Sequence, residues 1–198
     1  MTDFTKVTEN LKKRGFAVRS FPDRQAAADY LNGAIDGVSV GFGGSGTLEA
    51  MGLFESLGRH NTVHWHWKQE ANAARAAAAN TEVYLSSANA LAETGEIINI
   101  DGVGNRVAST LFGHRKLYIV AGRNKLAPTY EEALDRARNV AAPKRARQMG
   151  RKTPCALQAD RCYDCRSPER ICRGLVVLWC PTTGTDTEVL LIDEDLGN

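Results

Sequence analysis

Hydrophobic and polar residues follow two different periods along the first half of the chain. Four segments have apolar residues at near-helical spacing and predict amphipathic helices: residues 3–14, 22–35, 47–58 and 70–79. Four segments between and after them have the short apolar runs or the alternation of strands: residues 16–21, 38–42, 62–67 and 82–85. This alternation predicts an α/β protein with a mostly parallel sheet, helices on both faces, and a ligand site beyond the carboxyl ends of the strands.

The second half of the chain begins with a different pattern. Residues 90–100 form two short extended runs joined at Gly95, which predicts a β-hairpin. Turn residues then precede three expected elements: a short helix at 106–112, a strand at 116–121 and a long helix from 129 to about 149. Pro154 and Pro168 indicate that the next segment is irregular. We therefore expect a single domain over residues 1–198 with a cysteine-rich insertion at about 150–174.

Four of the five cysteines lie close together in the sequence. Their spacing is C-x6-C-x2-C-x6-C, formed by Cys155, Cys162, Cys165 and Cys172. Four thiolates grouped in this way can ligate one metal centre. The alternatives are two disulfides, a redox switch or unligated thiols. The N-terminal segment has no apolar stretch typical of a secretory signal, so we expect a reducing, cytoplasmic location in which disulfides are disfavoured.

The spacing favours an iron–sulfur cluster over zinc. Structural zinc sites usually pair two C-x2-C knuckles, whereas here one knuckle has two six-residue arms. The expected cofactor is therefore a [4Fe–4S] cluster, with Zn2+ as the alternative. Arginines around the cysteines would offset the negative charge of either centre. The fifth cysteine, Cys180, ends an apolar run that predicts a buried strand, so we expect it in the core.

Composition and charge narrow the classes of function. The chain is 43% hydrophobic, with no apolar run approaching the ~18 residues of a membrane span. Residues 136–173 contain eleven Lys or Arg against three Asp or Glu, a net charge of +8, so the remainder carries −6. This basic segment has one aromatic residue and four thiolates that would cancel about half of its excess, which argues against nucleic-acid binding. A homo-oligomer is compatible with this composition.

A glycine-rich loop between a predicted strand and helix is the first candidate ligand site. Residues 43–47 read Gly-Gly-Ser-Gly-Thr, with neither the Walker lysine nor the dinucleotide-binding spacing. Backbone N–H groups of such a loop can hold a phosphate or carboxylate, and the hydroxyl groups can add donors. The candidate residues are Gly43, Gly44, Ser45 and Thr47. The alternative is a tight turn with a helix cap.

Two later loops bring further polar side chains to the ends of predicted strands. The candidate ligand residues there are Asn89, Asp101, Asn105, Arg106, Asn124 and Lys125. Such groups are costly to bury without partners, so they either surround a ligand or bond one another in a polar network. Both interpretations stay open at this point. Asp101 and Asn105 also have the chemistry of a turn and a helix cap.

These loops together resemble the signature of the lactate-utilization (LUD) domain family, the LutC/YkgG-like proteins. The matching segments are SANA at 87–90, EIINIDG at 96–102, GNRVA at 104–108 and AGRNK at 121–125. The similarity continues into the cysteine block and covers roughly residues 36–175. It implies a NagB/RpiA/CoA-transferase-like three-layer α/β/α fold, and cytoplasmic bacterial use of lactate or a related 2-hydroxy acid alongside separate iron–sulfur oxidoreductase subunits.

The resemblance implies a function without fixing a catalytic residue. In CoA transferases of similar fold a glutamate before a turn glycine is the nucleophile, and Glu93 stands at a comparable place, although its sequence context departs from theirs. We expect an oxidoreductase subunit that binds a small anionic substrate and assists lactate oxidation. The alternatives are an isomerase- or CoA-transferase-like enzyme for a phosphorylated or acyl substrate with structural zinc, and a non-catalytic regulatory subunit.

His64 and His66 would lie on the same face of the strand predicted at 62–67. Two such imidazoles could bind a metal ion. With no third ligand nearby in the sequence, a half-buried strand edge is the simpler interpretation.

Overall fold

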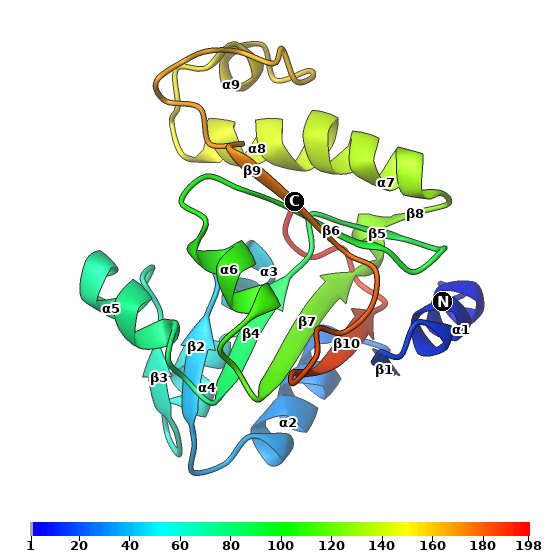
Figure 1. Ribbon diagram of the computed structural model, residues 1–198, viewed down its shortest axis with the longest axis vertical. Helices are drawn as coiled ribbons and strands as arrows, with labels where there is room; N and C mark the ends of the chain where they lie inside the picture. The colour runs from blue at the N-terminus through cyan, green and yellow to red at the C-terminus, as the bar shows by residue number, and fades with distance from the viewer. Residues whose placement is uncertain (1) are drawn as a thin grey trace.

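The computed structural model describes residues 2–198 (Figure 1). Its centre is a six-stranded parallel sheet in the order β1-β10-β7-β4-β2-β3. The strands are β1 (Ala17–Phe21), β2 (Ser39–Phe42), β3 (Thr62–His64), β4 (Val83–Ser87), β7 (Lys116–Gly122) and β10 (Asp186–Ile192). Helices flank this sheet, which confirms the α/β fold with a mostly parallel sheet.

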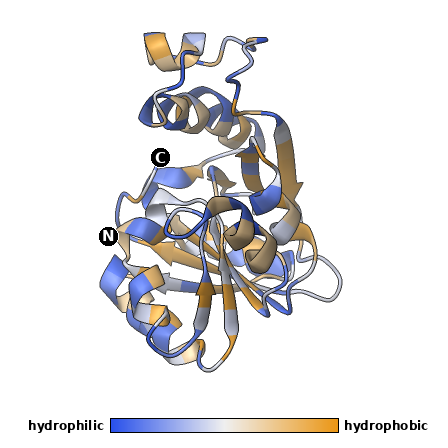
Figure 2. Ribbon diagram, turned by 90° about the vertical axis from the view of Figure 1, so that its left-hand side faces the viewer, coloured by the Kyte–Doolittle hydropathy of each residue, from blue (hydrophilic) through white to orange (hydrophobic). Residues whose placement is uncertain are grey.

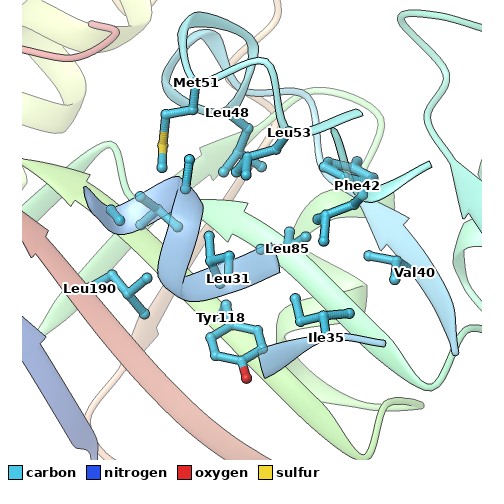
Figure 3. Close-up of a cluster of buried hydrophobic side chains, with 14 of the residues drawn as sticks. Leu31, Ile35, Val40, Phe42, Leu48, Met51, Leu53, Leu85, Tyr118 and Leu190 are labelled. Atoms are coloured by element: carbon cyan, nitrogen blue, oxygen red, sulfur yellow. The ribbon is translucent and has the colours of Figure 1, made fainter. Parts of the chain in front are cut away.

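Three helices cover one face of the central sheet. They are α2 (Arg24–Ala34), α3 (Gly46–Ala50) and α4 (Leu53–Leu57). Figure 3 shows Leu31 of α2 and Leu48 of α3 pointing toward Leu85 and Leu190 on the strands, and all four side chains are fully buried. Removing one such leucine side chain would cost about 2–5 kcal/mol, because the packed neighbours cannot collapse into the space.

The predicted helix at 47–58 is divided into two. Gly52, which lies between α3 and α4, has a φ of 62°. An α-helix cannot continue through this left-handed conformation, and glycine adopts it without steric cost.

A second sheet and several helices cover the other face. This sheet has the order β8-β5-β6-β9, formed by β5 (Ala90–Ala92), β6 (Ile97–Asp101), β8 (Leu126–Ala127) and β9 (Gly174–Leu178). Ala90 pairs antiparallel with Ile98, which confirms the predicted hairpin. On this side of the central sheet, α6 (Asn105–Leu111) packs beside β4 and β6, α1 (Thr5–Lys13) beside β1, and α5 (Ala71–Ala78) beside β2 and β3. A 3-10 turn, η1 (Arg123–Lys125), follows β7.

One long helix lies over the outer face of the second sheet. It consists of α7 (Tyr130–Arg136), a π-helical turn η2 (Ala137–Ala141) and α8 (Ala142–Gln148), which confirms the long helix expected at 129–149. Ala133 and Ala137 are buried against the second sheet. The π-helical turn precedes Pro143, a residue without an N–H to donate to the preceding turn.

The cysteine-bearing segment lies beyond this helix, on the side away from the central sheet (Figures 1 and 2). It contains one short helix, α9 (Pro154–Gln158), and is otherwise irregular up to β9. Within residues 2–198, no helix has both the length and the apolar character needed to cross a membrane.

Two sequence predictions are wrong in this fold. Cys180 is exposed and not part of the core, because it lies beyond the end of β9, an edge strand paired only with β6. The strand expected at 62–67 ends at His64, so His64 and His66 do not share a strand face. Trp65 is fully buried, and His66 lies in the turn that follows it.

Candidate functional site

A cleft lies at the carboxyl ends of β2, β4 and β7, where the loops after these strands face α8. Its inner part, the inner chamber, has a volume of about 430 Å³. Polar and small residues from these loops and from α8 line much of this chamber, chiefly Gly44, Ser45, Ser87, Asn89, Arg106, Lys125, Arg145, Gln148 and Gly197, with Trp67 and Ile171. Among residues 2–198, Glu49 is the one acidic side chain of this lining, against Arg106, Lys125 and Arg145, so the concave chamber is basic on balance.

Lys125 is the most unusual residue of the inner chamber. It is only 4% exposed, and its Nζ donates hydrogen bonds to Thr47 Oγ1 at 2.9 Å and to Ser87 Oγ at 2.7 Å. Among residues 2–198, no carboxylate lies within salt-bridge distance of this ammonium group. Burial, with Arg136 and Arg106 nearby, lowers the pKa of Lys125 to about 7. A bound anion would stabilise the charged form of this side chain.

Arg106 has a different environment from Lys125. Its guanidinium donates to the Ile100 carbonyl at 2.7 Å, to the Asn89 side chain at 3.2 Å and to the Asn99 side chain, and its Nε lies 3.3 Å from the Asp101 carboxylate. Burial lowers the pKa of Arg106, but an arginine stays charged at neutral pH. The polar network considered from the sequence is therefore present, and it forms the wall of the cleft.

The glycine-rich loop brings its backbone close to this wall. A Cβ at Gly43 would lie 2.8 Å from Arg106 Cγ, and one at Gly44 would lie 3.0 Å from the indole nitrogen of Trp67. Ser45 Oγ accepts the N–H of Leu48 at 3.2 Å and so caps α3. Because α3 has only five residues, its helix dipole contributes little to anion binding at this loop.

The predicted ligand residues divide into three groups. Five line the inner chamber: Gly44, Ser45, Asn89, Arg106 and Lys125. Asp101 and Asn105 line an adjoining cavity. Gly43, Thr47 and Asn124 line neither cavity. Thr47 contacts the cleft indirectly, because its hydroxyl accepts a hydrogen bond from Lys125 Nζ. The Asn124 side chain accepts the N–H of Leu196 at 3.0 Å and so holds the segment after β10 in place.

Glu93 lies in the turn of the β5–β6 hairpin. Its carboxylate pairs with Lys6 Nζ at 2.8 Å, and it lines neither the inner chamber nor the cavity next to it. Glu93 is therefore separate from the cleft, and its proposed role in acyl transfer stays a prediction from the sequence.

Sequence reasoning missed two residues that shape the cleft. Trp67 stacks on Trp65 at 5.4 Å between ring centroids, and the Arg145 guanidinium lies 4.5 Å from the Trp67 ring centre. Arg145 belongs to the basic segment 136–173, and its positive charge was the one sequence feature that could have marked it as an anion-binding residue. Its position opposite the glycine loop depends on how α8 packs over the second sheet, which no local pattern reveals.

The inner chamber continues into a second cavity, the outer chamber, of about 440 Å³. Six residues border both chambers: Gly44, Trp67, Ile100, Arg106, Arg145 and Ile171. The charged and imidazole side chains found only in the outer chamber are His66, Arg75, Asp101, Arg151, Glu169, Arg170 and Arg173. Arginine is thus the dominant charged residue of this cavity.

The four clustered cysteines line a third, narrow cavity next to the outer chamber, together with Arg138 and Arg170. The backbone N–H of Asp164 lies 3.3 Å from Cys162 Sγ, and burial raises the pKa of Cys172. Within residues 2–198, however, no three His, Cys, Asp or Glu side chains are arranged as a metal-binding group. The cysteines therefore surround one cavity, while a metal-binding lobe is not shown.

One residue connects all three cavities. Ile171 borders the inner chamber, the outer chamber and the cysteine cavity. The cysteine segment is thus a direct neighbour of the cleft.

Comparisons with known proteins give the family. The family model of the LUD domain matches residues 4–191 of the chain. The chain belongs to the LUD domain family. This family is associated in general with lactate utilization. No curated protein matches the chain.

A solved LUD-type structure has the same fold. The crystal structure of a DUF162 family protein from Deinococcus radiodurans matches with a TM-score of 0.56 and 13% sequence identity, over 97% of this chain and 99% of that chain. At this identity the similarity establishes the fold and no more.

Proposed function

We propose that the inner chamber binds the carboxylate of lactate or a related 2-hydroxy acid. The observation that carries this proposal is Lys125, a buried ammonium group with two hydroxyl partners and no carboxylate partner within the described part of the chain. A small carboxylate would give this cation a counter-charge that the protein does not supply. The association of LUD proteins with lactate utilization supports this choice of anion.

The other predicted residues have supporting roles in this proposal. Ser45 and Ser87 line the chamber and offer hydroxyl groups to the bound carboxylate. Arg106 is held rigidly by its network, so it adds positive charge without losing further conformational entropy. Asn89, which shares this network, would orient the ligand against Arg106.

We further propose that Cys155, Cys162, Cys165 and Cys172 hold a [4Fe–4S] cluster, with Zn2+ as the alternative. Support comes from the shared cavity of the four side chains, from the N–H directed at Cys162, and from Arg138 and Arg170 beside them. When bound, such a cluster carries single electrons. A cluster next to the cleft fits a cytoplasmic subunit that assists lactate oxidation with separate iron–sulfur oxidoreductase partners.

The carboxylate proposal is tested by isothermal titration of the purified protein with L-lactate, D-lactate, pyruvate and acetate. We expect saturable binding of a 2-hydroxy or 2-oxo acid in the wild type and loss of binding in Lys125→Met. Lys12→Met is the matched control, because Lys12 is an exposed lysine of α1. Equal binding to wild type and Lys125→Met would overturn the proposal.

A second candidate function is favoured by the arginines of the outer chamber. They suit a phosphorylated or acyl-carrier substrate of an isomerase- or transferase-like enzyme with structural zinc. Activity on such a substrate that survives removal of iron would support this candidate. A regulatory subunit without chemistry would instead bind the anion and show no turnover with any partner.

A further inference from the structure

The outer chamber contains arginines without a carboxylate partner and without a backbone carbonyl to hold the guanidinium group. Among residues 2–198, no carboxylate lies within salt-bridge distance of Arg75, Arg145 or Arg151. By contrast, Arg170 pairs with the Asp164 carboxylate at 3.0 Å and donates to Cys165 O at 2.8 Å. Arg173 also has no carboxylate partner among these residues, but its guanidinium is held by the carbonyls of Arg170 and Pro168, at 3.0 and 2.9 Å. The first three arginines are therefore the ones whose charge is free for a ligand.

The two carboxylates of the outer chamber do not neutralise these arginines. Asp101 accepts the N–H groups of Val103 and Gly104, each at 3.0 Å, and lies beside Arg106. Glu169 accepts the N–H of Lys152 at 2.8 Å. Both acids are thus engaged in local structure, and the chamber keeps a net positive charge.

Two buried nitrogens of the chamber wall also lack a hydrogen-bond partner. Within the part of the chain that the structure describes, His66 Nδ1 and Arg75 Nε are buried and have no hydrogen-bond partner. Leaving a buried polar group unpaired costs about 1–3 kcal/mol, so such groups are commonly found where a ligand or an ordered water completes the structure. Both residues line the outer chamber and neither lines the inner one.

The type of cation indicates the type of anion. The basic residues of this chamber are arginines, whose planar, forked donors can bind two phosphate oxygens at once. The single carboxylate of the proposed hydroxy acid would instead bind Lys125 in the inner chamber. We propose that the outer chamber binds the phosphate groups of an organic diphosphate, held by Arg75, Arg145 and Arg151. Arg75 and Arg145 each donate one hydrogen bond to a neutral amide oxygen, of Asn72 and Gln148, so their charges stay uncompensated. Together with Arg151, they match the roughly three negative charges of a diphosphate at neutral pH.

The position of Arg145 links this site to the inner chamber. Arg145 borders both chambers and lies over the Trp67 ring, which also stacks on Trp65. Because Trp67 already packs against both side chains, we do not assign it a role in stacking on a base. The recognition we propose is therefore of the diphosphate group.

The test is an isothermal titration with inorganic pyrophosphate and, in a second arm, ADP. We expect pyrophosphate to bind the wild type and to bind Arg75→Gln and Arg151→Gln about tenfold or more weakly. These two residues line the outer chamber alone, so lactate binding should be unchanged in both variants. Arg59→Gln is the matched control, because it removes the charge of an exposed arginine that lines neither chamber.

The second arm distinguishes the sources of the phosphate. Tighter binding of ADP than of pyrophosphate supports the site and points to a nucleotide, and equal binding supports it with recognition of the diphosphate alone. The proposal is overturned when Arg75→Gln and Arg151→Gln bind pyrophosphate as the wild type does, or when Arg59→Gln weakens binding as much as they do. Lys125→Met should keep pyrophosphate binding, so failure of the lactate site and failure of this site are distinguishable.

A second measurement uses the wild-type protein and therefore does not depend on whether the variants fold. Phenylglyoxal modification of the wild-type protein, mapped by mass spectrometry, should show Arg75 and Arg151 protected by pyrophosphate and Arg59 unprotected. Equal modification of all three arginines with and without pyrophosphate would contradict the proposal.

Discussion

Lys125 Nζ and Ser87 Oγ meet across 2.7 Å at the floor of the cleft, although 38 residues separate them in the sequence. Ser87 ends β4 and Lys125 follows the neighbouring strand β7, so the parallel pairing of these strands brings the two side chains together. This contact gives the ammonium group a neutral partner. Its charge is left for a ligand, and the predictions about binding depend on that arrangement.

Lactate binding should weaken as the pH rises through about 7. The pKa of Lys125 is about 7 in the free protein, and the anion binds the protonated form. Above that pH the protonated fraction falls about tenfold for each pH unit, and the affinity falls with it. Titrations in buffers of different ionisation enthalpy should also show proton uptake on binding at about pH 8. A pH-independent affinity between about 6 and 9 would contradict the role of Lys125.

Replacing Lys125 by Met should stabilise the free protein. The pKa of Lys125 is about 7 in the folded protein, against an ordinary lysine value of 10.5, so between these values the unfolded chain binds more protons. The cost of burying the charge is therefore complete below about pH 7 and disappears as the pH rises toward 10.5. We expect a gain of about 1–4 kcal/mol in the free energy of unfolding at about pH 6.5, measured by urea denaturation. This gain should shrink at higher pH.

Replacing Arg106 by Met should have the opposite effect. Arg106 is surrounded by acceptors, and its removal would take away the ionic partner of the Asp101 carboxylate and one donor each from the Asn89 and Ile100 oxygens. Loss of one partner of a buried ionic network costs about 3–5 kcal/mol. The free energy of unfolding of Arg106→Met and Lys125→Met would be measured by urea denaturation under the same conditions. Similar changes in stability for the two variants would show that their environments do not differ as the structure describes.

Gly102→Ala should displace the cysteine segment. A Cβ at Gly102 would lie 2.6 Å from the Ile171 carbonyl oxygen, a backbone atom that cannot rotate away. We expect a loss of about 1–3 kcal/mol and faster proteolysis between residues 159 and 173. Gly33→Ala is the control, because Gly33 is an exposed residue of α2 where an added Cβ would have no atom within 4 Å, and it should be neutral or stabilising. Equal stability of the two variants would contradict the close approach at Ile171.

The sequence indicated most regular elements because each has an apolar face of the right period. The helices at 22–35 and 129–149 and the hairpin at 90–100 are clear examples. Which strands pair with one another was harder to predict from the sequence. β8 has two residues, too few for a periodic pattern, and the run ending at Cys180 has the composition of a core strand although β9 is an edge strand.

The candidate site was partly predictable for a similar reason. Loops after parallel strands converge at one edge of a sheet, which is why Ser45, Asn89 and Lys125 border the same chamber. Trp67 and Arg145 come from segments whose patterns indicated a strand and a charged helix. Their contact exists because α8 packs across the second sheet, and such a tertiary relationship leaves no local signal.

The central claim is that the cysteine segment beside the anion-binding cleft holds an iron–sulfur cluster, and chemical analysis tests it most directly. The protein is purified without oxygen, and iron, acid-labile sulfide and zinc are measured per chain together with the visible absorbance. We predict brown protein with about four irons and matching sulfide, lost in Cys162→Ser and kept in Cys180→Ser. Colourless protein with about one zinc and no sulfide would contradict the claim and make the segment a structural zinc site.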